Sequence, residues 1–241
     1  MRIEFFSIAS RFRGPPHSGN GGYVCGRIAT HLHGTIAVRL KSPPPLDTEV
    51  RLESTVDSAR LFHGRDLIGE ARRAELSLEL KRPPTYEQAQ VSTRSFAGFT
   101  AHRFPGCFVC GTERDQGDGM RIFPGPVPAT DVLASPWVPD ASLAGQGDDV
   151  ASEFLWSALD CPSGFAVFPL PEDKAIVLGE LCASLVGKLK VGQPSVVTAW
   201  PLGADGRKRY SASAVHSLDG RLVAMGKAVW IEVPSTAWNA A

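Results

Sequence analysis

Hydrophobic and polar residues alternate along most of this chain, and the alternating runs are separated by turn residues. Such period-two patterns predict β-strands, whereas a spacing of three to four residues predicts a helix. The predicted strands cover residues 2–13, 35–56 and 58–80, with turns inside the longer ranges, and then 175–190, 195–202, 208–217 and 221–233. Helical spacing is found in two segments, 22–33 and 150–159.

The two predicted helices differ in their local signals. Gly26 lies inside the first helix and costs about 1 kcal/mol relative to alanine, so tertiary burial must hold that helix in place. Asp149 is a candidate N-cap for the second helix, and Pro162 and Gly164 are expected to end it. The first helix is therefore expected to depend on its neighbours more than the second.

The strand pattern occurs twice. Segments 37–41, 51–53 and 66–71 of the first half have counterparts, in the same order, at 185–190, 195–198 and 221–228. The last hairpin of the second half is longer by roughly ten residues, and hairpin turns tolerate such drift. A unit of this length exceeds a solenoid repeat, so the sequence predicts two similar domains. We place them at 1–82 and 104–241, joined by a linker at 83–103.

The connection between the halves contains few periodic segments. Residues 81–118 are rich in proline and glycine and are expected to cross the molecule. The second half then opens with Met120-Arg121-Ile122-Phe123, followed by a hairpin signal that ends at 131–137.

Composition excludes several classes of protein. The chain has 25 Lys and Arg residues and 25 Asp and Glu residues, so no net field favours nucleic acid. No apolar run approaches the roughly 18 residues of a membrane span, and the N-terminus lacks a signal-peptide pattern. We therefore expect neither a nucleic-acid nor a membrane partner, and a cytoplasmic location. Five cysteines are an odd number at low density, which favours reduced thiols.

One helix wrapped by a long antiparallel sheet, repeated once, resembles the double hotdog architecture of acyl-CoA thioesterases. The resemblance implies an α+β fold of two tandem hotdog domains, each a long antiparallel sheet around a central helix. In the branch that includes the phenylacetyl-CoA type, a His-Gly-Gly loop begins the central helix, and an acidic residue follows about two turns later. Asn20-Gly21-Gly22 is similar to the loop, with asparagine replacing histidine, and Asp160 is similar to the acid. The first half lacks the acid, because Ala29 stands at the equivalent position. The second half lacks the glycine loop, because 151–153 stands in its place.

The resemblance further implies a site shared between the halves, because that branch combines the loop of one subunit with the acid of its neighbour. The catalytic residues would be Asn20, Gly22, Tyr23 and Asp160, with Gly21 binding substrate. Backbone N–H groups near Gly22 and Tyr23 would stabilise an oxyanion at the helix N-terminus, and Asp160 would act as general base or nucleophile. Asn20 can orient a carbonyl group or water but cannot carry a proton at neutral pH.

Further candidates are substrate-binding residues. Glu153, Trp156 and Ser157 share a helical stripe with Asp160, and His17 belongs to the loop before the first helix. Each candidate has a structural alternative. Asp160 can be a buried acid bonded to amides or to an arginine, Glu153 a solvated acid at a helix start, and the glycines a tight turn.

Cys107-Phe108-Val109-Cys110-Gly111 forms a CxxCG motif, which is also similar to the start of some hotdog thioesterase relatives. His102 lies nearby, yet no second CxxC follows, and structural zinc normally needs four ligands. We therefore predict no metal, with a packed turn as the default and a metal site or a redox dithiol as the alternatives. Cys161 has no local histidine to activate it as a nucleophile.

The leading hypothesis from the sequence is a hydrolase of acyl-CoA or a similar thioester that uses no cofactor, coenzyme A being part of the substrate. The alternative is a non-catalytic protein that binds acyl-CoA or a small acyl ligand, because fold alone does not confer chemistry. A dehydratase ranks third, since neither helix start carries the Asp and His pair of that family. The fused halves already satisfy the minimal hotdog pair, so both a monomer and a homodimer are possible.

Overall fold

The structure is a computed structural model in which residues 1–238 are described. The first half contains β1 (Arg2–Ser7), α1 (Gly21–Ala29), β2 (Ile36–Leu40), β3 (Glu49–Ser54), β4 (Ser58–His63) and β5 (Asp66–Arg73). The second half contains β6 (Gly125–Pro126), β7 (Leu133–Trp137), α3 (Ser152–Phe165), β8 (Lys174–Leu185), β9 (Ser195–Asp205), β10 (Lys208–Ser217) and β11 (Leu222–Pro234). Between them lies α2 (Tyr86–Thr93), and short 3-10 helices occupy Ser10–Phe12, Ala97–Phe99, Ala141–Leu143 and Ser235–Trp238.

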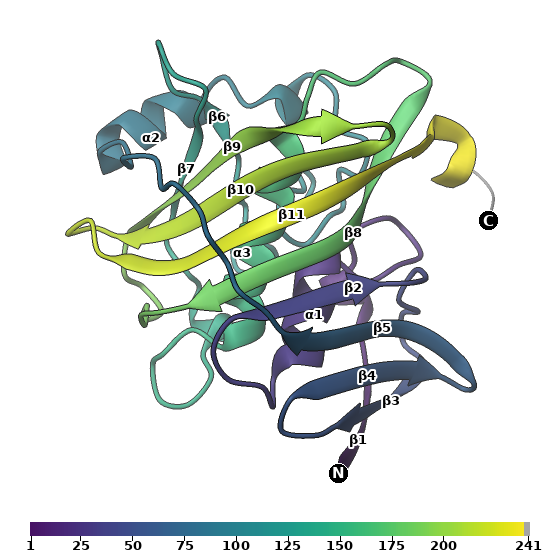
Figure 1. Cartoon of the computed structure of the whole chain (residues 1–241). Coiled ribbons are helices and arrows are strands. Elements are labelled where there is room, and N and C mark those ends of the chain that lie inside the picture. The colour runs from purple at the N-terminus through teal and green to yellow at the C-terminus, as the bar shows by residue number, and fades with distance from the viewer. Residues whose placement is uncertain (239–241) are drawn as a thin grey trace.

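All the strands belong to one antiparallel sheet, whose order is β1-β3-β4-β5-β2-β8-β11-β10-β9-β7-β6 (Figure 1). The halves meet at β2 and β8, where Ile36 pairs with Ala183 and Arg39 with Glu180. Outward from this junction, the order β2-β5-β4-β3-β1 is repeated as β8-β11-β10-β9-β7. This is the predicted α+β class with two tandem hotdog halves.

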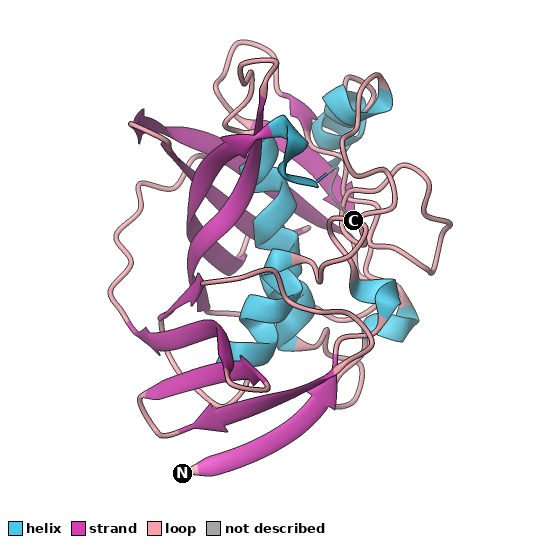
Figure 2. Cartoon of the chain, turned by 90° about the vertical axis from the view of Figure 1, so that its right-hand side faces the viewer, coloured by secondary structure: helices cyan, strands magenta, loops and turns pink. Residues whose placement is uncertain are grey.

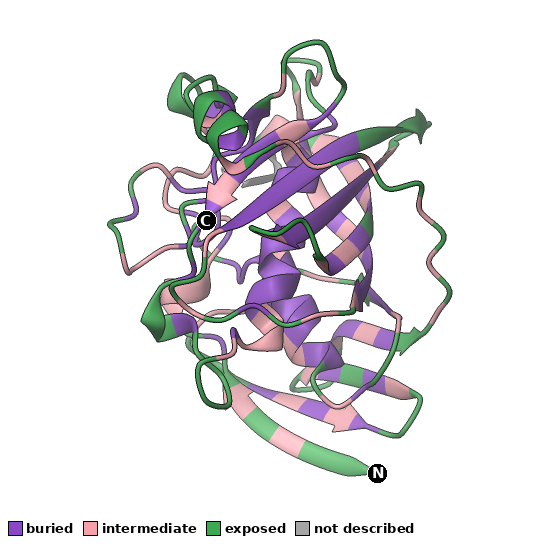
Figure 3. Ribbon diagram, turned by 90° about the vertical axis from the view of Figure 1, so that its left-hand side faces the viewer, coloured by how far each residue is buried: buried purple, intermediate pink, exposed green. Residues whose placement is uncertain are grey.

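The helices α1 and α3 lie on one face of the curved sheet, and loops cover their other side (Figure 2). Strand alternation provides the surface against which they pack: Val50 and Leu52 of β3 are buried, whereas the neighbouring Glu49 is exposed. Both helices are largely buried, in contrast to the edge strand β1 (Figure 3). No helix among residues 1–238 is long and apolar enough to cross a membrane.

Glycines allow α1 and α3 to approach closely. A Cβ atom at Gly22 would lie 2.4 Å from Asp160 Cβ and 2.9 Å from Ser157 Cα. One turn further along α1, a Cβ atom at Gly26 would lie 2.4 Å from Glu153 Cα. A later residue of α1 contacts an earlier residue of α3, so the two helices run antiparallel. Gly26 is fully surrounded, which confirms that tertiary packing holds the first helix in place.

The boundaries of several predicted elements were wrong, and residues 74–80, predicted as strand, lie outside the sheet because β5 ends at Arg73. The first strand ends at Ser7, and the first helix ends at Ala29 rather than His33. The second helix does not stop before Pro162 but continues to Phe165. A helical proline removes one backbone bond. Here the lost bond is the one to the Ala158 carbonyl, and α3 continues past it while packed against β8, β9, β10 and β11. Ser213 Oγ and Ser163 Oγ donate to the next two carbonyls, those of Leu159 and Asp160, each at 2.7 Å.

The predicted N-cap of the second helix was also wrong. Ala151 occupies the N-cap position and makes no side-chain capping bond. The Asp149 carboxylate instead accepts a hydrogen bond from Lys188 Nζ at 2.5 Å. Lys188 lies in a segment predicted as strand, but β8 ends at Leu185, so 186–190 leaves the sheet.

The connection contains more structure than its sequence predicted. It includes α2, whose N-cap Thr85 forms a reciprocal capping box with Gln88, and its preceding segment passes across the sheet (Figure 1). Met120-Arg121-Ile122-Phe123 does not join the sheet, because the amides of Met120 and Ile122 donate to Phe108 and Val109. The division into domains at 1–82 and 104–241, joined by a linker at 83–103, stays a prediction.

Candidate active site

Asp160 lies in the middle of α3, and its carboxyl group faces the N-terminus of α1. Asp160 Oδ2 accepts a hydrogen bond from the Gly22 backbone N–H at 2.8 Å and another from Asn20 Nδ2 at 2.9 Å. The side chain is 2 % exposed. The glycine-led helix start of the first half therefore meets the acid of the second half, as the resemblance implied.

Asn20 links the two helices. Its side-chain oxygen accepts from the Tyr23 amide at 2.9 Å and so caps α1, while its amide group donates to Asp160. A histidine at this position would have offered a proton carrier, whereas the asparagine offers one acceptor and one donor group that both have partners. Asn20 therefore holds the carboxyl group against the helix start.

Replacing Asn20 with alanine is expected to lower the free energy of unfolding by about 2 kcal/mol, because the variant loses both an N-cap and a bond to a buried carboxyl group. Urea denaturation measures this change. Thr85→Ala is the matched control, since Thr85 is an exposed N-cap whose loss is expected to cost about 1 kcal/mol. Equal losses in the two variants would show that the bond to Asp160 adds nothing.

The environment of Asp160 raises the pKa of its carboxyl group, so that the neutral acid and the carboxylate coexist near neutral pH. Burial raises the pKa of this carboxyl to about 7, and the nearby Cys107 acts in the same direction, whereas the bonds from Gly22 and Asn20 lower it. The second carboxyl oxygen, Oδ1, is buried and has no hydrogen-bond partner among the described residues. A buried acceptor without a partner costs stability and needs an explanation, and six other side chains among the described residues also carry a buried polar atom without a hydrogen-bond partner.

The amides expected to stabilise an oxyanion are both engaged within the protein. The Gly22 N–H binds Asp160, and the Tyr23 N–H binds Asn20. Among residues 1–238, the Gly21 N–H at the first position of α1 has no partner. Gly21 also lies close to the acid, since a Cβ atom there would be 3.6 Å from Asp160 Oδ2. The available amide is thus one residue earlier than the sequence suggested.

The other predicted site residues do not all lie next to Asp160. Glu153 and Ser157 face α1 across the glycine contacts, and the Ser157 hydroxyl donates to the Glu153 carbonyl at 2.7 Å. The Tyr23 ring stacks on Phe12 with ring centroids 4.2 Å apart. His17 is exposed on the loop before α1, and no contact in the described part of the chain brings it to Asp160.

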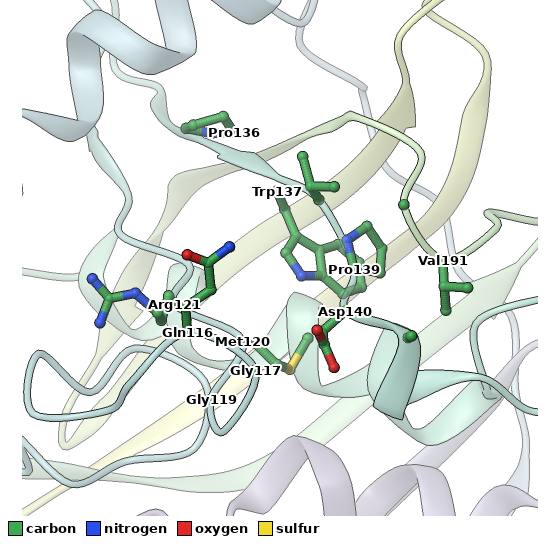
Figure 4. A pocket seen from close by; sticks show the side chains of 13 residues that line it. Gln116, Gly117, Gly119, Met120, Arg121, Pro136, Trp137, Pro139, Asp140 and Val191 are labelled. Atoms are coloured by element: carbon green, nitrogen blue, oxygen red, sulfur yellow. The ribbon is translucent and has the colours of Figure 1, made fainter.

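Two pockets in the described part of the chain lie elsewhere than at Asp160. The larger pocket, of about 580 Å³, is formed by the loops around Met120, Trp137 and Val191, and none of the predicted site residues lines it (Figure 4). A smaller pocket of about 260 Å³ is lined by Ala29, Ser152 and Trp156 among others. This is the second junction between the halves, where the acid and the glycine loop are both missing. Trp156 therefore faces a cavity, but not at the junction that contains Asp160.

Three thiols lie beside Asp160 and Asn20. The sulfur atoms of Cys107, Cys110 and Cys161, which we call the thiol cluster, all lie within 4.8 Å of one another. Hydrogen bonds from the Cys110 and Cys161 thiols, followed by the amides of Cys110 and Val109, hold the pKa of Cys107 well below its usual range. The CxxC pair is a local motif of the sequence, whereas Cys161 gives no such signal because it lies 54 positions after Cys107.

The sheet order, the two antiparallel helices and the repeated halves define the chain as a double hotdog protein. Solved structures agree over nearly the whole chain. An acyl-CoA thioesterase II, TesB2, from Mycobacterium marinum shares 10 % identity and a TM-score of 0.61, covering 96 % of this chain and 93 % of that one. A tesB protein from Mycobacterium avium subs paratuberculosis shares 11 % identity and a TM-score of 0.59, with the same coverage.

A third structure, a conserved protein of unknown function with a hot dog fold from Alicyclobacillus acidocaldarius, shares 9 % identity and a TM-score of 0.52. It covers 96 % of this chain and 93 % of its own. Comparison with family models and with curated proteins finds no match for the sequence. At these identities the similarity establishes the fold, and the chemistry must be argued from the site.

Proposed function

We propose that this protein hydrolyses acyl-CoA or a similar thioester at the junction of α1 and α3, with Asp160 as the reacting group. One observation carries the proposal: a buried carboxyl group from one half is held against the helix start of the other half, and one of its oxygens has no partner. Hotdog neighbours named acyl-CoA thioesterase support the substrate class.

The arrangement fits the chemistry of thioester hydrolysis. Asp160 Oδ1 removes a proton from water as the water oxygen attacks the carbonyl carbon, and the developing oxyanion accepts a hydrogen bond from the Gly21 N–H. The C–S bond then breaks, and the proton passes to the leaving CoA thiolate. Alternatively, Asp160 attacks the carbonyl itself and water hydrolyses the resulting anhydride. Asn20 and Gly22 keep the carboxyl group in position for either route.

Access to Asp160 requires a local movement, since the residue is 2 % exposed and the neighbouring Leu178 is itself buried, whereas Gly21 and Cys161 are partly exposed. Leu178 contacts the position of a Gly21 Cβ atom at 2.9 Å. We infer that movement of this side chain would open the approach to the first turn of α1. We infer that the acyl group enters from this side.

The test is the release of free CoA thiol from a panel of short, aromatic and long acyl-CoAs by the purified protein. We expect turnover that depends on enzyme concentration, with one class of acyl chain preferred at the level of kcat/KM. The heat-unfolded protein is the blank. Failure of the folded protein to hydrolyse any member of the panel would contradict the proposal.

The alternative function, binding of a small acyl ligand without turnover, is favoured by a different observation. The Gly22 and Tyr23 amides are engaged, and the pocket of about 260 Å³ lies at the other junction, which has no acid. Calorimetric titration with the same acyl-CoAs distinguishes the two functions. Tight binding without release of thiol would establish the binding protein.

A further inference from the structure

The thiol cluster joins two parts of the chain that are distant in sequence. Cys107 and Cys110 come from the connection between the halves, whereas Cys161 comes from α3. The connection is fixed at this point, because the Phe108 amide donates to the Arg13 carbonyl at 2.8 Å and Met120 donates to Phe108. The three sulfur atoms therefore converge because the connection packs between the loop before α1 and the middle of α3.

The sulfur spacing matches that of a tetrahedral metal site. Cys107 Sγ and Cys161 Sγ are 3.6 Å apart, too far for a disulfide bond. Zinc binds thiolate sulfur at about 2.3 Å, so two sulfurs of a tetrahedral site lie about 3.8 Å apart. All three pairs of sulfurs in the cluster lie within 4.8 Å. Small side-chain rotations are enough to bring them to bonding distance of one ion.

The backbone around the CxxC pair is shaped for this arrangement. Gly111 has no room for a side chain, since a Cβ atom there would lie 2.3 Å from the Cys107 carbonyl oxygen and 2.5 Å from that of Pro105. The resulting tight turn brings Cys107 and Cys110 to the same side of the loop. Asn20 Nδ2 lies 3.5 Å from Cys161 Sγ and 4.0 Å from Cys107 Sγ, where an amide donor favours a thiolate.

The structure assigns a zinc site to the thiol cluster, in which Cys107, Cys110 and Cys161 are the protein ligands and a water molecule completes the tetrahedron. Among residues 1–238, no further histidine, cysteine or acid lies close enough to all three sulfurs to be a fourth protein ligand. Soft thiolates select zinc over magnesium or calcium. Cys161 is partly exposed, which gives the ion a route to the cluster.

The proposed ion would tie the connection to α3 across a loop of 54 residues. It would thereby fix the distance between the CxxC turn and the residue beside Asp160. This role is independent of thioester hydrolysis, because a zinc site of this kind stabilises the protein whether or not it turns over acyl-CoA.

The test is elemental analysis of protein purified without chelators and without a metal-affinity resin. We expect about one zinc ion per chain in the wild type. We expect a loss of at least tenfold in Cys161→Ala but not in Cys182→Ala, a buried thiol outside the cluster. Removal of the ion with a strong chelator is expected to lower the unfolding temperature by about 5 °C.

A second measurement does not depend on the folding of a variant. Wild-type protein stripped of metal and titrated with Co²⁺ is expected to show a thiolate-to-cobalt charge-transfer band that saturates at about one equivalent. Zinc below about a tenth of an ion per chain together with no cobalt band would overturn the site. Iron or copper in place of zinc would overturn the zinc assignment. Since neither readout uses acyl-CoA, a failure here is distinguishable from a failure of the proposed hydrolysis.

Discussion

Replacing Asp160 with asparagine is expected to lower kcat for acyl-CoA hydrolysis at least a hundredfold, with little change in KM. Asparagine has the same shape and still accepts a bond from the Gly22 N–H, but it can neither remove a proton from water nor attack as a carboxylate. A general base contributes about 10²–10⁴ to the rate, which sets the expected size of the loss. Release of CoA thiol under saturating and limiting substrate measures both constants.

The matched control for this variant is Asp173→Asn. Asp173 follows α3 on the way to β8, and its side chain is 72 % exposed, so the substitution removes the same charge far from the helix junction. We expect wild-type activity from this control. Circular dichroism and urea denaturation verify that Asp160→Asn remains folded. Activity within tenfold of the wild type in a folded Asp160→Asn protein would rule out Asp160 as base and as nucleophile.

Replacing Gly26 with alanine is expected to lower the free energy of unfolding by about 3 kcal/mol, although alanine is the better helix former. The new Cβ atom would lie 2.4 Å from Glu153 Cα, 2.9 Å from Glu153 Cβ and 3.1 Å from Trp156 Cβ. The first of these is a backbone atom, which cannot rotate away, so the two helices must separate. Overpacking of this kind costs about 1–3 kcal/mol or more, and exceeds the gain of about 1 kcal/mol in helix propensity.

Urea denaturation measures the effect, and Thr30→Ala is the control at the exposed C-terminal end of the same helix. We expect the control to change stability by less than about 0.5 kcal/mol. An unchanged or raised stability of Gly26→Ala would mean that α1 and α3 can move apart at no cost. The close approach of the two helices would then not be required by the fold.

The sequence predicted most strands correctly because alternation reports directly which face of a strand is buried. It also predicted that Asn20, Gly22 and Asp160 would meet. The first half has the glycine-led helix start and the second half has the acid, so the two can combine only if the halves pack as partners. The resemblance to hotdog proteins supplied the relative placement of the halves. Periodicity alone carries no information about that placement.

One error arose where a local signal was overridden by tertiary packing. Pro162 reads as a helix end, but α3 packs against β8, β9, β10 and β11 and continues to Phe165. Gly26 reads as a weak point of a helix that needs tertiary support, and Glu153 of α3 lies against it. In each case the contacts come from another element and have no counterpart in the local pattern.

The sequence by itself determined most of the strands, the two central helices, the repeat and the residues able to do chemistry, because each follows from side-chain type and short-range spacing. Only the tertiary structure decided that the Gly22 and Tyr23 amides are engaged while Gly21 is available, and that Cys161 joins Cys107 and Cys110. These outcomes depend on how α1, α3 and the connection pack against one another. Contacts between segments many residues apart are fixed by the whole core, which no local pattern encodes.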